Sequence, residues 1–265
     1  MGKSTWINAF ANYCLFDTLE EAAKAGGFFP IPFNFKFEDP QTGEEITQAI
    51  SSSEGELSES IPITKTGESV TKNPNEYVFR YGNCAINLID TPGLLSTRDV
   101  GTCSHETDKK HVDNILKLLS SYQEIHAIFI LMQANEPRLS ESFQYTLTEI
   151  FKRLDKSACN NVIFIFTFAS NFTSPKTQSV LRQFLKDKNL PIVLPPAKPT
   201  IYYFENGSVD YLAESLNGIP RDKDSKTAAQ TSWRKSVKTT KELLDHVCSL
   251  EPHVFAHWNH MLWLL

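Results

Sequence analysis

Short apolar segments alternate with amphipathic segments over the second half of the chain. The apolar segments are rich in isoleucine, valine and aromatic residues and span 126–132, 161–169 and 200–206. The amphipathic segments repeat apolar residues at helical spacing and span 105–121, 139–156 and 174–188. Buried strands that alternate with helices predict an α/β fold in three layers, with a parallel sheet covered on both faces.

The first half of the chain has a different pattern. Residues 4–24 carry apolar residues at helical spacing and predict one or two helices. Residues 28–37 predict a strand whose pairing is limited by prolines. The polar, acidic stretch 38–68 predicts a flexible loop, and residues 76–90 then predict an antiparallel hairpin at the edge of the sheet.

The last predicted helix covers residues 225–250. Its apolar stripe consists of Trp233, Val237, Leu244 and Val247. A stripe of this kind must be buried against another element, so the helix either packs on the core or begins a second module.

Composition narrows the class of protein. The chain has 265 residues, 41% of them hydrophobic, which is enough for one large core, or for a core with a helical appendage. A net charge of −5 gives no basic excess, so we expect no nucleic-acid partner. Five widely spaced cysteines without a CxxC pair predict reduced thiols in a cytoplasmic protein. No signal peptide and no transmembrane segment is expected.

The first candidate for chemistry is Gly2-Lys3-Ser4-Thr5. It matches the end of the phosphate-binding pattern G-x-x-x-x-G-K-S/T, in which backbone N–H groups surround the phosphates. Lys3 would neutralise the β- and γ-phosphates, and the hydroxyl of Ser4 would hold Mg²⁺. Taken alone, the four residues also fit an ordinary helix start with a serine cap. The strand that should precede such a loop is missing, so we expect an N-terminally truncated chain.

A second candidate follows the predicted hairpin. Asp90-Thr91-Pro92-Gly93 ends a strand about 85 residues beyond the lysine. Asp90 would hold Mg²⁺ through its water shell, and the N–H of Gly93 would reach a γ-phosphate. Thr71, in the polar loop before the hairpin, would complete the metal shell, although Ser69 and Thr66 are alternatives. A strand followed by an ordinary turn is the competing interpretation.

With these motifs in order, the chain resembles the P-loop GTPases of the septin-like TRAFAC class, and in particular AIG/GIMAP-type and related animal G-domain proteins. The stretches that carry the resemblance are "GKSTWINAFANY", "ESVTK", "LIDTPG" and "NVIFIFT". The resemblance covers about residues 2 to 220. It implies a G domain that binds GTP or GDP with Mg²⁺ and often forms a homodimer through its nucleotide face.

The resemblance also indicates how the base would be held, and where this chain departs from the family. Thr167 and Phe168 occupy the first positions of the guanine-reading motif, and Phe168 is placed to stack on the base. Ser170 stands where the family has an aspartate, so guanine selectivity is weakened. Asn206, after the last strand, would contact the base. Leu94 follows Gly93 where some GTPases carry a water-orienting glutamine, so we expect slow hydrolysis.

The sequence therefore predicts a G domain over residues 1–220, lacking its first strand, and a C-terminal helical extension over 221–265. The expected function is a guanine-nucleotide-binding switch protein with slow, Mg²⁺-dependent GTP hydrolysis. Lys3, Thr71 and Gly93 would carry the catalytic roles, and Ser4, Thr71 and Asp90 the metal. The alternative is a pseudo-GTPase scaffold that has lost nucleotide binding. A P-loop kinase or ATPase is a third option, which the hairpin before Asp90 argues against.

Overall fold

The central sheet of the computed structural model consists of three parallel strands. The structure describes residues 2–38, 43–51, 75–81, 84–91, 105–119, 121–136, 138–170, 175–195 and 199–254. The strands are β6 (Ile128–Gln133), β7 (Val162–Thr167) and β8 (Ile201–Tyr203), in the order β6-β7-β8. All six residues of β7 are buried, as expected for the middle strand of a parallel sheet. The predicted parallel sheet is confirmed.

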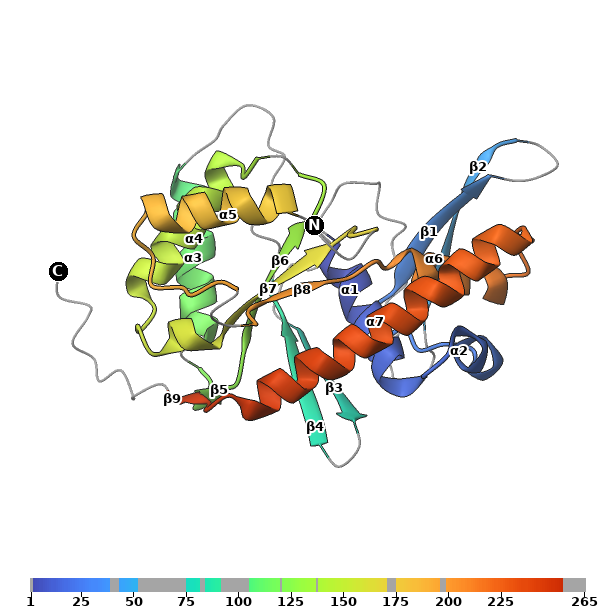
Figure 1. Ribbon diagram of the computed structural model, residues 1–265, viewed down its shortest axis with the longest axis horizontal. Helices are drawn as coiled ribbons and strands as arrows, with labels where there is room; N and C mark the ends of the chain where they lie inside the picture. The colour runs from blue at the N-terminus through green and yellow to red at the C-terminus, as the bar shows by residue number, and fades with distance from the viewer. Residues whose placement is uncertain are drawn as a thin grey trace.

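Helices cover both faces of this sheet (Figure 1), and the side chains of β7 point alternately to the two sides. Ile163 and Ile165 belong to the core cluster that α1 (Lys3–Leu15), α6 (Gly207–Leu216) and α7 (Lys223–Ser249) complete. Val162, Phe164 and Phe166 belong to a second cluster with α3 (His105–Leu119), α4 (Glu141–Arg153) and α5 (Pro175–Asp187). The three-layer α/β fold class is therefore correct.

Helix α7 belongs to the first of these cores. Trp233 is fully buried; its ring contacts that of Tyr13 edge-on at 5.0 Å, and its Nε1 donates to the carbonyl of Phe16 at 3.2 Å. Val237 and Leu244 are also buried in this cluster, and Val247 packs against it. The predicted apolar stripe thus packs on the core. The domain boundary at residue 220 remains a prediction, although the core is continuous across it.

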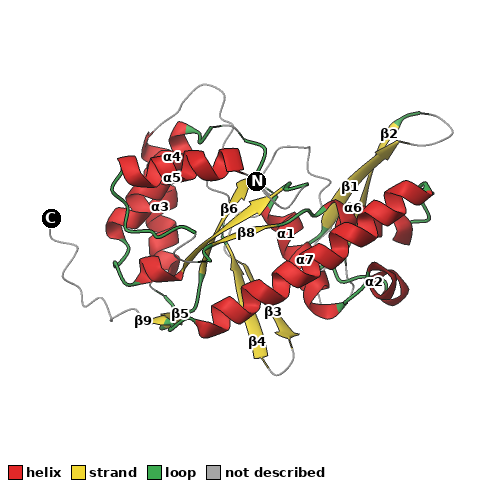
Figure 2. Ribbon diagram, viewed as in Figure 1, coloured by secondary structure: helices red, strands yellow, loops and turns green. Residues whose placement is uncertain are grey.

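Two hairpins flank the core (Figure 2). The predicted hairpin is present as β3 (Asn75–Tyr81) paired with β4 (Cys84–Asp90), and β1 (Phe33–Glu38) pairs with β2 (Glu45–Ile50). Among the described strands, β3 and β4 form a two-stranded sheet of their own and not the predicted edge of the β6-β7-β8 sheet. The loop prediction was wrong for residues 45–50, because β2 pairs along the whole length of β1. Pro30 and Pro32 precede β1 and do not limit its pairing.

The smaller elements were not predicted separately. They are α2 (Leu19–Ala25), a 3₁₀ helix at Ala158–Asn161, and the short pair β5 (Glu124–Ile125) with β9 (His253–Val254). Among the described residues, no helix has both the length and the apolar character needed to cross a lipid bilayer.

Two buried asparagines join α1 to the segment that leads into β1. The Asn8 side chain donates to the carbonyl of Ile31 at 2.9 Å and accepts from its N–H at 3.0 Å. Asn12 does the same with Phe28, at 2.5 and 2.9 Å. Because both amides are fully buried, they supply the hydrogen bonds that a neighbouring strand would otherwise provide.

Candidate functional site

The lysine of the predicted phosphate loop and the aspartate of the second motif meet in space. Lys3 is the first residue of α1, and its Nζ donates to the carboxylate of Asp90 and to the carbonyl of Thr91. The Asp90 side chain is fully buried at the end of β4, whereas that of Lys3 is 25% exposed. Residues 87 positions apart thus form one charged cluster at the N-terminus of α1.

Gly2 brings a third element to this cluster. It precedes α1 with a φ of 67°, a left-handed conformation that favours glycine. A Cβ at this position would lie 3.4 Å from Phe168 Cε2 and 4.0 Å from Thr167 Oγ1. The C-terminal end of β7 therefore borders the start of α1. The residues predicted to contact the phosphates thus lie next to those predicted to contact the base.

Phe168 has an unusual conformation. Its φ is 55°, and the residue is 51% exposed. A left-handed backbone at an aromatic residue carries a conformational cost, and such residues cluster at ligand sites. The exposed ring is available for stacking on a flat ligand. Thr167, in contrast, is buried, and its hydroxyl donates to the carbonyl of Met132 at 3.3 Å.

The loop after β8 carries Asn206, which is 7% exposed. Its side-chain Oδ1 is buried and has no hydrogen-bond partner among the described residues. A buried polar atom without a partner is unusual in a folded protein and indicates a site where a ligand or water binds. Asn206 directly precedes α6 but does not cap it with its side chain.

The preceding residue of this loop is tied to two helices. The carbonyl of Glu205 accepts from Ser232 Oγ at 3.0 Å, from Ser236 Oγ at 3.4 Å and from the hydroxyl of Tyr13 at 3.5 Å. Burial raises the pKa of the Tyr13 phenol well above its usual range, so the hydroxyl keeps its proton and donates. The loop that carries Asn206 is thereby fixed to α1 and α7.

The other predicted site residues are placed only in part. Ser4 and Thr5 lie half-buried in the first turn of α1, next to Lys3. Thr71 and Gly93 lie outside the described residues. Within the described ranges, no group of three or more His, Cys, Asp or Glu side chains forms a metal site. A single carboxylate with a nearby hydroxyl suits Mg²⁺, which keeps several of its waters.

The model of the AIG1 family matches residues 61–213, which is more than half of the chain. The chain belongs to the AIG1 family. It is thus a G protein of a GTP-binding class, and the resemblance inferred from the motifs is correct. No curated protein sequence is similar enough to this AIG1-family chain to count as a match.

Solved structures with similar folds include Toc33 from Arabidopsis thaliana. A dimerization-deficient mutant of Toc33 matches with a TM-score of 0.43 at 16% identity, over 69% of this chain and 73% of that chain. Toc33 in complex with Mg²⁺ and GMPPNP matches with a TM-score of 0.40 at 15% identity, over 66% of this chain and 73% of that chain. The similarity is distant and says nothing about the ligands of this AIG1-family protein.

One set of site residues had no signal in the sequence. These residues lie on α7, which the motifs of the family do not include. Ser232 and Ser236 were unremarkable hydroxyls of an amphipathic helix until the fold brought them against the loop after β8. A search for serines one helical turn apart would not have singled them out.

Proposed function

We propose that this AIG1-family chain is a guanine-nucleotide-binding switch protein that uses Mg²⁺. The observation that carries the proposal is the contact of Lys3 with Asp90 beside Gly2 and Phe168. A cation, a buried carboxylate, a helix N-terminus and an exposed aromatic ring thus lie together at one edge of the sheet. These are the groups needed for phosphate, metal and base.

The residues divide these roles as follows. Lys3 and the N-terminal N–H groups of α1 bind phosphate oxygens, because a cation and a helix N-terminus both attract anions. Ser4 and Thr71 would hold Mg²⁺, and Asp90 would hold it through its water shell; the bound ion would supply charge neutralisation at the phosphates. Gly93 donates its N–H to the γ-phosphate, and Thr5 extends the phosphate-binding turn.

The base occupies the other end of the same edge. Phe168 stacks on it, and Asn206 offers the side-chain oxygen that has no partner among the described residues. Thr167 supports this end through its hydrogen bond to β6. Hydrolysis is slow, because Leu94 follows Gly93 and provides no group to orient a water molecule.

Titration with fluorescent GTP, GDP and ATP, with Mg²⁺ and with EDTA, tests the proposal. We expect binding of GTP and GDP that weakens in EDTA, and a loss of at least about tenfold in Lys3→Ala, since a charge-assisted hydrogen bond contributes roughly 1.5–3 kcal/mol. Lys24→Ala is the matched control, because Lys24 is exposed on α2, away from the site. Absence of binding by the wild-type chain would refute the switch proposal.

A specific observation favours a second candidate, the pseudo-GTPase scaffold. The ammonium of Lys3 is already paired with Asp90 and with the carbonyl of Thr91, so phosphate must compete with this ion pair. Ser170 also lacks the charge of the aspartate that reads guanine. A chain that binds no nucleotide but assembles through this face would be such a scaffold.

The proposal also includes an oligomeric state and a location in the cell. A homodimer would form through the nucleotide face, where the exposed ring of Phe168 lies; sedimentation velocity with and without nucleotide tests this. A cytoplasmic location is supported by Cys14, Cys159 and Cys248, which are thiols and not disulfides.

A further inference from the structure

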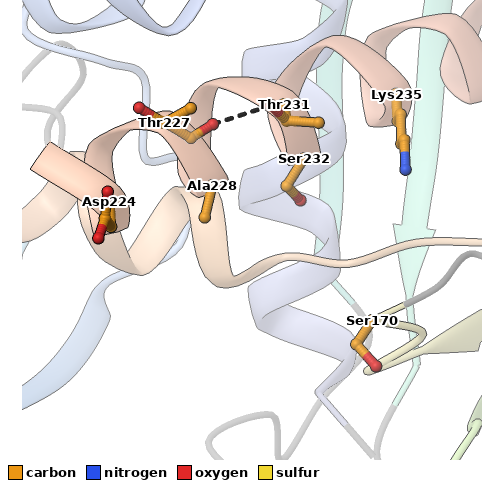
Figure 3. A pocket seen from close by; sticks show the side chains of 7 residues that line it. All are labelled: Ser170, Asp224, Thr227, Ala228, Thr231, Ser232 and Lys235. Carbon is orange, nitrogen blue, oxygen red and sulfur yellow. Dashed lines mark hydrogen bonds between the residues drawn. The ribbon is translucent and has the colours of Figure 1, made fainter.

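A groove of about 440 Å³, lined mainly by polar and charged residues, lies between α7 and the loop after β7 (Figure 3). One wall is a single face of α7; its residues are Asp224, Thr227, Ala228, Thr231, Ser232 and Lys235. The facing residue is Ser170, two positions after Phe168. The volume falls in the range of small-molecule sites.

The position of the groove relates it to the base end of the proposed nucleotide site. Ser170 continues the loop that carries Phe168, and Ser232 donates to the carbonyl of Glu205, the neighbour of Asn206. The groove is therefore bordered by the loop that carries Phe168, and it is linked through Ser232 to the loop that carries Asn206. Figure 3 shows the side chains of Ser232 and Lys235 pointing from α7 toward the side on which Ser170 lies.

The hydrogen bond of Ser232 determines whether its hydroxyl can donate to a ligand or accept from one. A serine hydroxyl has one proton to donate and two lone pairs that accept. Since the proton of Ser232 is directed to the carbonyl of Glu205 at 3.0 Å, the oxygen can offer only an acceptor to a ligand in the groove. Lys235, one turn further along α7, is in contrast a pure donor.

We propose that α7 reads the base of the nucleotide, with Ser232 accepting from the N1–H and Lys235 donating to the 6-oxo group of a 6-oxopurine. This inference rests on the proposed function. It assigns the recognition of guanine to a helix that lies outside the motif at Thr167–Ser170, where the expected carboxylate is replaced by serine.

The chemistry of the bases makes the proposal selective. Adenine presents a lone pair at N1 and an amino group at C6, so it would oppose acceptor to acceptor at Ser232 and donor to donor at Lys235. Mismatched polar groups in a binding site are rejected strongly, since each is left without a hydrogen bond. Ser170 offers the 2-amino group no charged acceptor. The carboxylate of the lining, Asp224, lies eight residues before Ser232, about 12 Å along the helix, too far to reach the same base. The groove should thus distinguish guanine from adenine strongly, and guanine from hypoxanthine only weakly, because the acceptors left for the 2-amino group, Ser170 and Asn206, are neutral.

The test measures the affinities of GDP, IDP and ADP for the full chain in Mg²⁺, by calorimetry. We expect GDP and IDP to bind within about threefold of each other, and ADP at least about tenfold more weakly, as loss of a hydrogen bond to a charged group implies. Lys235→Met should weaken GDP and IDP by about tenfold and leave ADP unchanged. Lys238→Met is the matched control, because the Lys238 side chain is 80% exposed and does not line the groove.

Each outcome bears on the proposal. If no nucleotide binds, both the proposed function and this inference are wrong. If GDP binds but Lys235→Met keeps the ratio of GDP to ADP affinity, or if IDP binds more than tenfold more weakly than GDP, only the inference is overturned. Lys235 is exposed, and an unchanged thermal midpoint of the variant shows that it is folded.

Discussion

Replacing Asn8 by leucine should destabilise the protein strongly, although asparagine is the more polar residue and the site is fully buried. The Asn8 amide is joined by two hydrogen bonds to Ile31, which is 3% exposed. Leucine has nearly the shape of asparagine but can neither donate nor accept. The substitution thus leaves the N–H and the carbonyl of Ile31 buried without partners.

The magnitude follows from these two groups. Each unsatisfied buried group costs about 1–3 kcal/mol, so the two groups of Ile31 together cost about 4 kcal/mol at the middle of this range. The burial of the leucine side chain returns up to about 2 kcal/mol. We therefore expect the free energy of unfolding of Asn8→Leu to fall by about 2–4 kcal/mol. Asn12→Leu should act in the same direction but less strongly, because Asn12 holds Phe28 by the same pair of contacts and Phe28 is only half-buried.

Urea denaturation followed by tryptophan fluorescence measures the change in the free energy of unfolding. The slope of this free energy against urea concentration should be the same in the variant and the wild type. The matched control is Asn114→Leu, an exposed helical asparagine on α3, which should change the free energy of unfolding by no more than about 0.5 kcal/mol. If Asn8→Leu is no more destabilising than Asn114→Leu, the amides do not stabilise the segment between α2 and β1, and the reasoning fails.

Three other predictions use single substitutions or labelling. Trp233→Ala should lower the free energy of unfolding by about 3–5 kcal/mol, because it empties a fully buried site; a loss below about 1 kcal/mol in urea denaturation would show that α7 is not part of the core. Phe168→Gly should leave stability unchanged or raise it by up to about 1 kcal/mol, since the left-handed backbone no longer costs energy, while nucleotide affinity falls by about tenfold or more as stacking is lost; unchanged affinity in the same titration would remove Phe168 from the site. Burial raises the pKa of the Cys14 thiol to about 12, so the thiolate is scarce at pH 8, and alkylation by iodoacetamide should be slow at Cys14 and fast at the exposed Cys248. The rate at Cys14 should rise about tenfold per pH unit between pH 8 and 10, and peptide mapping that finds equal rates at the two cysteines would contradict this.

The parts of the fold that the sequence predicts well are those in which burial leaves a periodic pattern. β7 is buried on both faces and is therefore a continuous apolar run, and α4 and α5 each bury one stripe. β2 was missed for the opposite reason. Residues 45–49 are all exposed, so no alternation of apolar and polar residues marks the strand. Its pairing with β1 is a tertiary fact that the local sequence does not contain.

The candidate site also has a part that the sequence predicts and a part that it does not. Lys3 and Asp90 were predicted to act together because each belongs to a motif with a fixed chemical role, and the structure brings them into contact. The conformation of Phe168 was not predictable, since its positive φ follows from the path of the chain after β7 and not from the residue itself. The face of α7 that lines the groove is polar and ordinary in sequence, and only the fold shows what it faces.

Helix α7 would connect the stability of the fold with recognition of the proposed ligand. Trp233 buries its ring against Tyr13, and the adjacent Ser232 donates to the carbonyl of Glu205. Because these neighbours are fixed on one rigid helix, the packing of the tryptophan positions the groove and the loop that carries Asn206. A boundary at residue 220 would separate the core from the helix that is hydrogen-bonded to the loop after β8. We therefore infer that residues 223–249 act as part of the nucleotide-binding unit and not as an appendage to it.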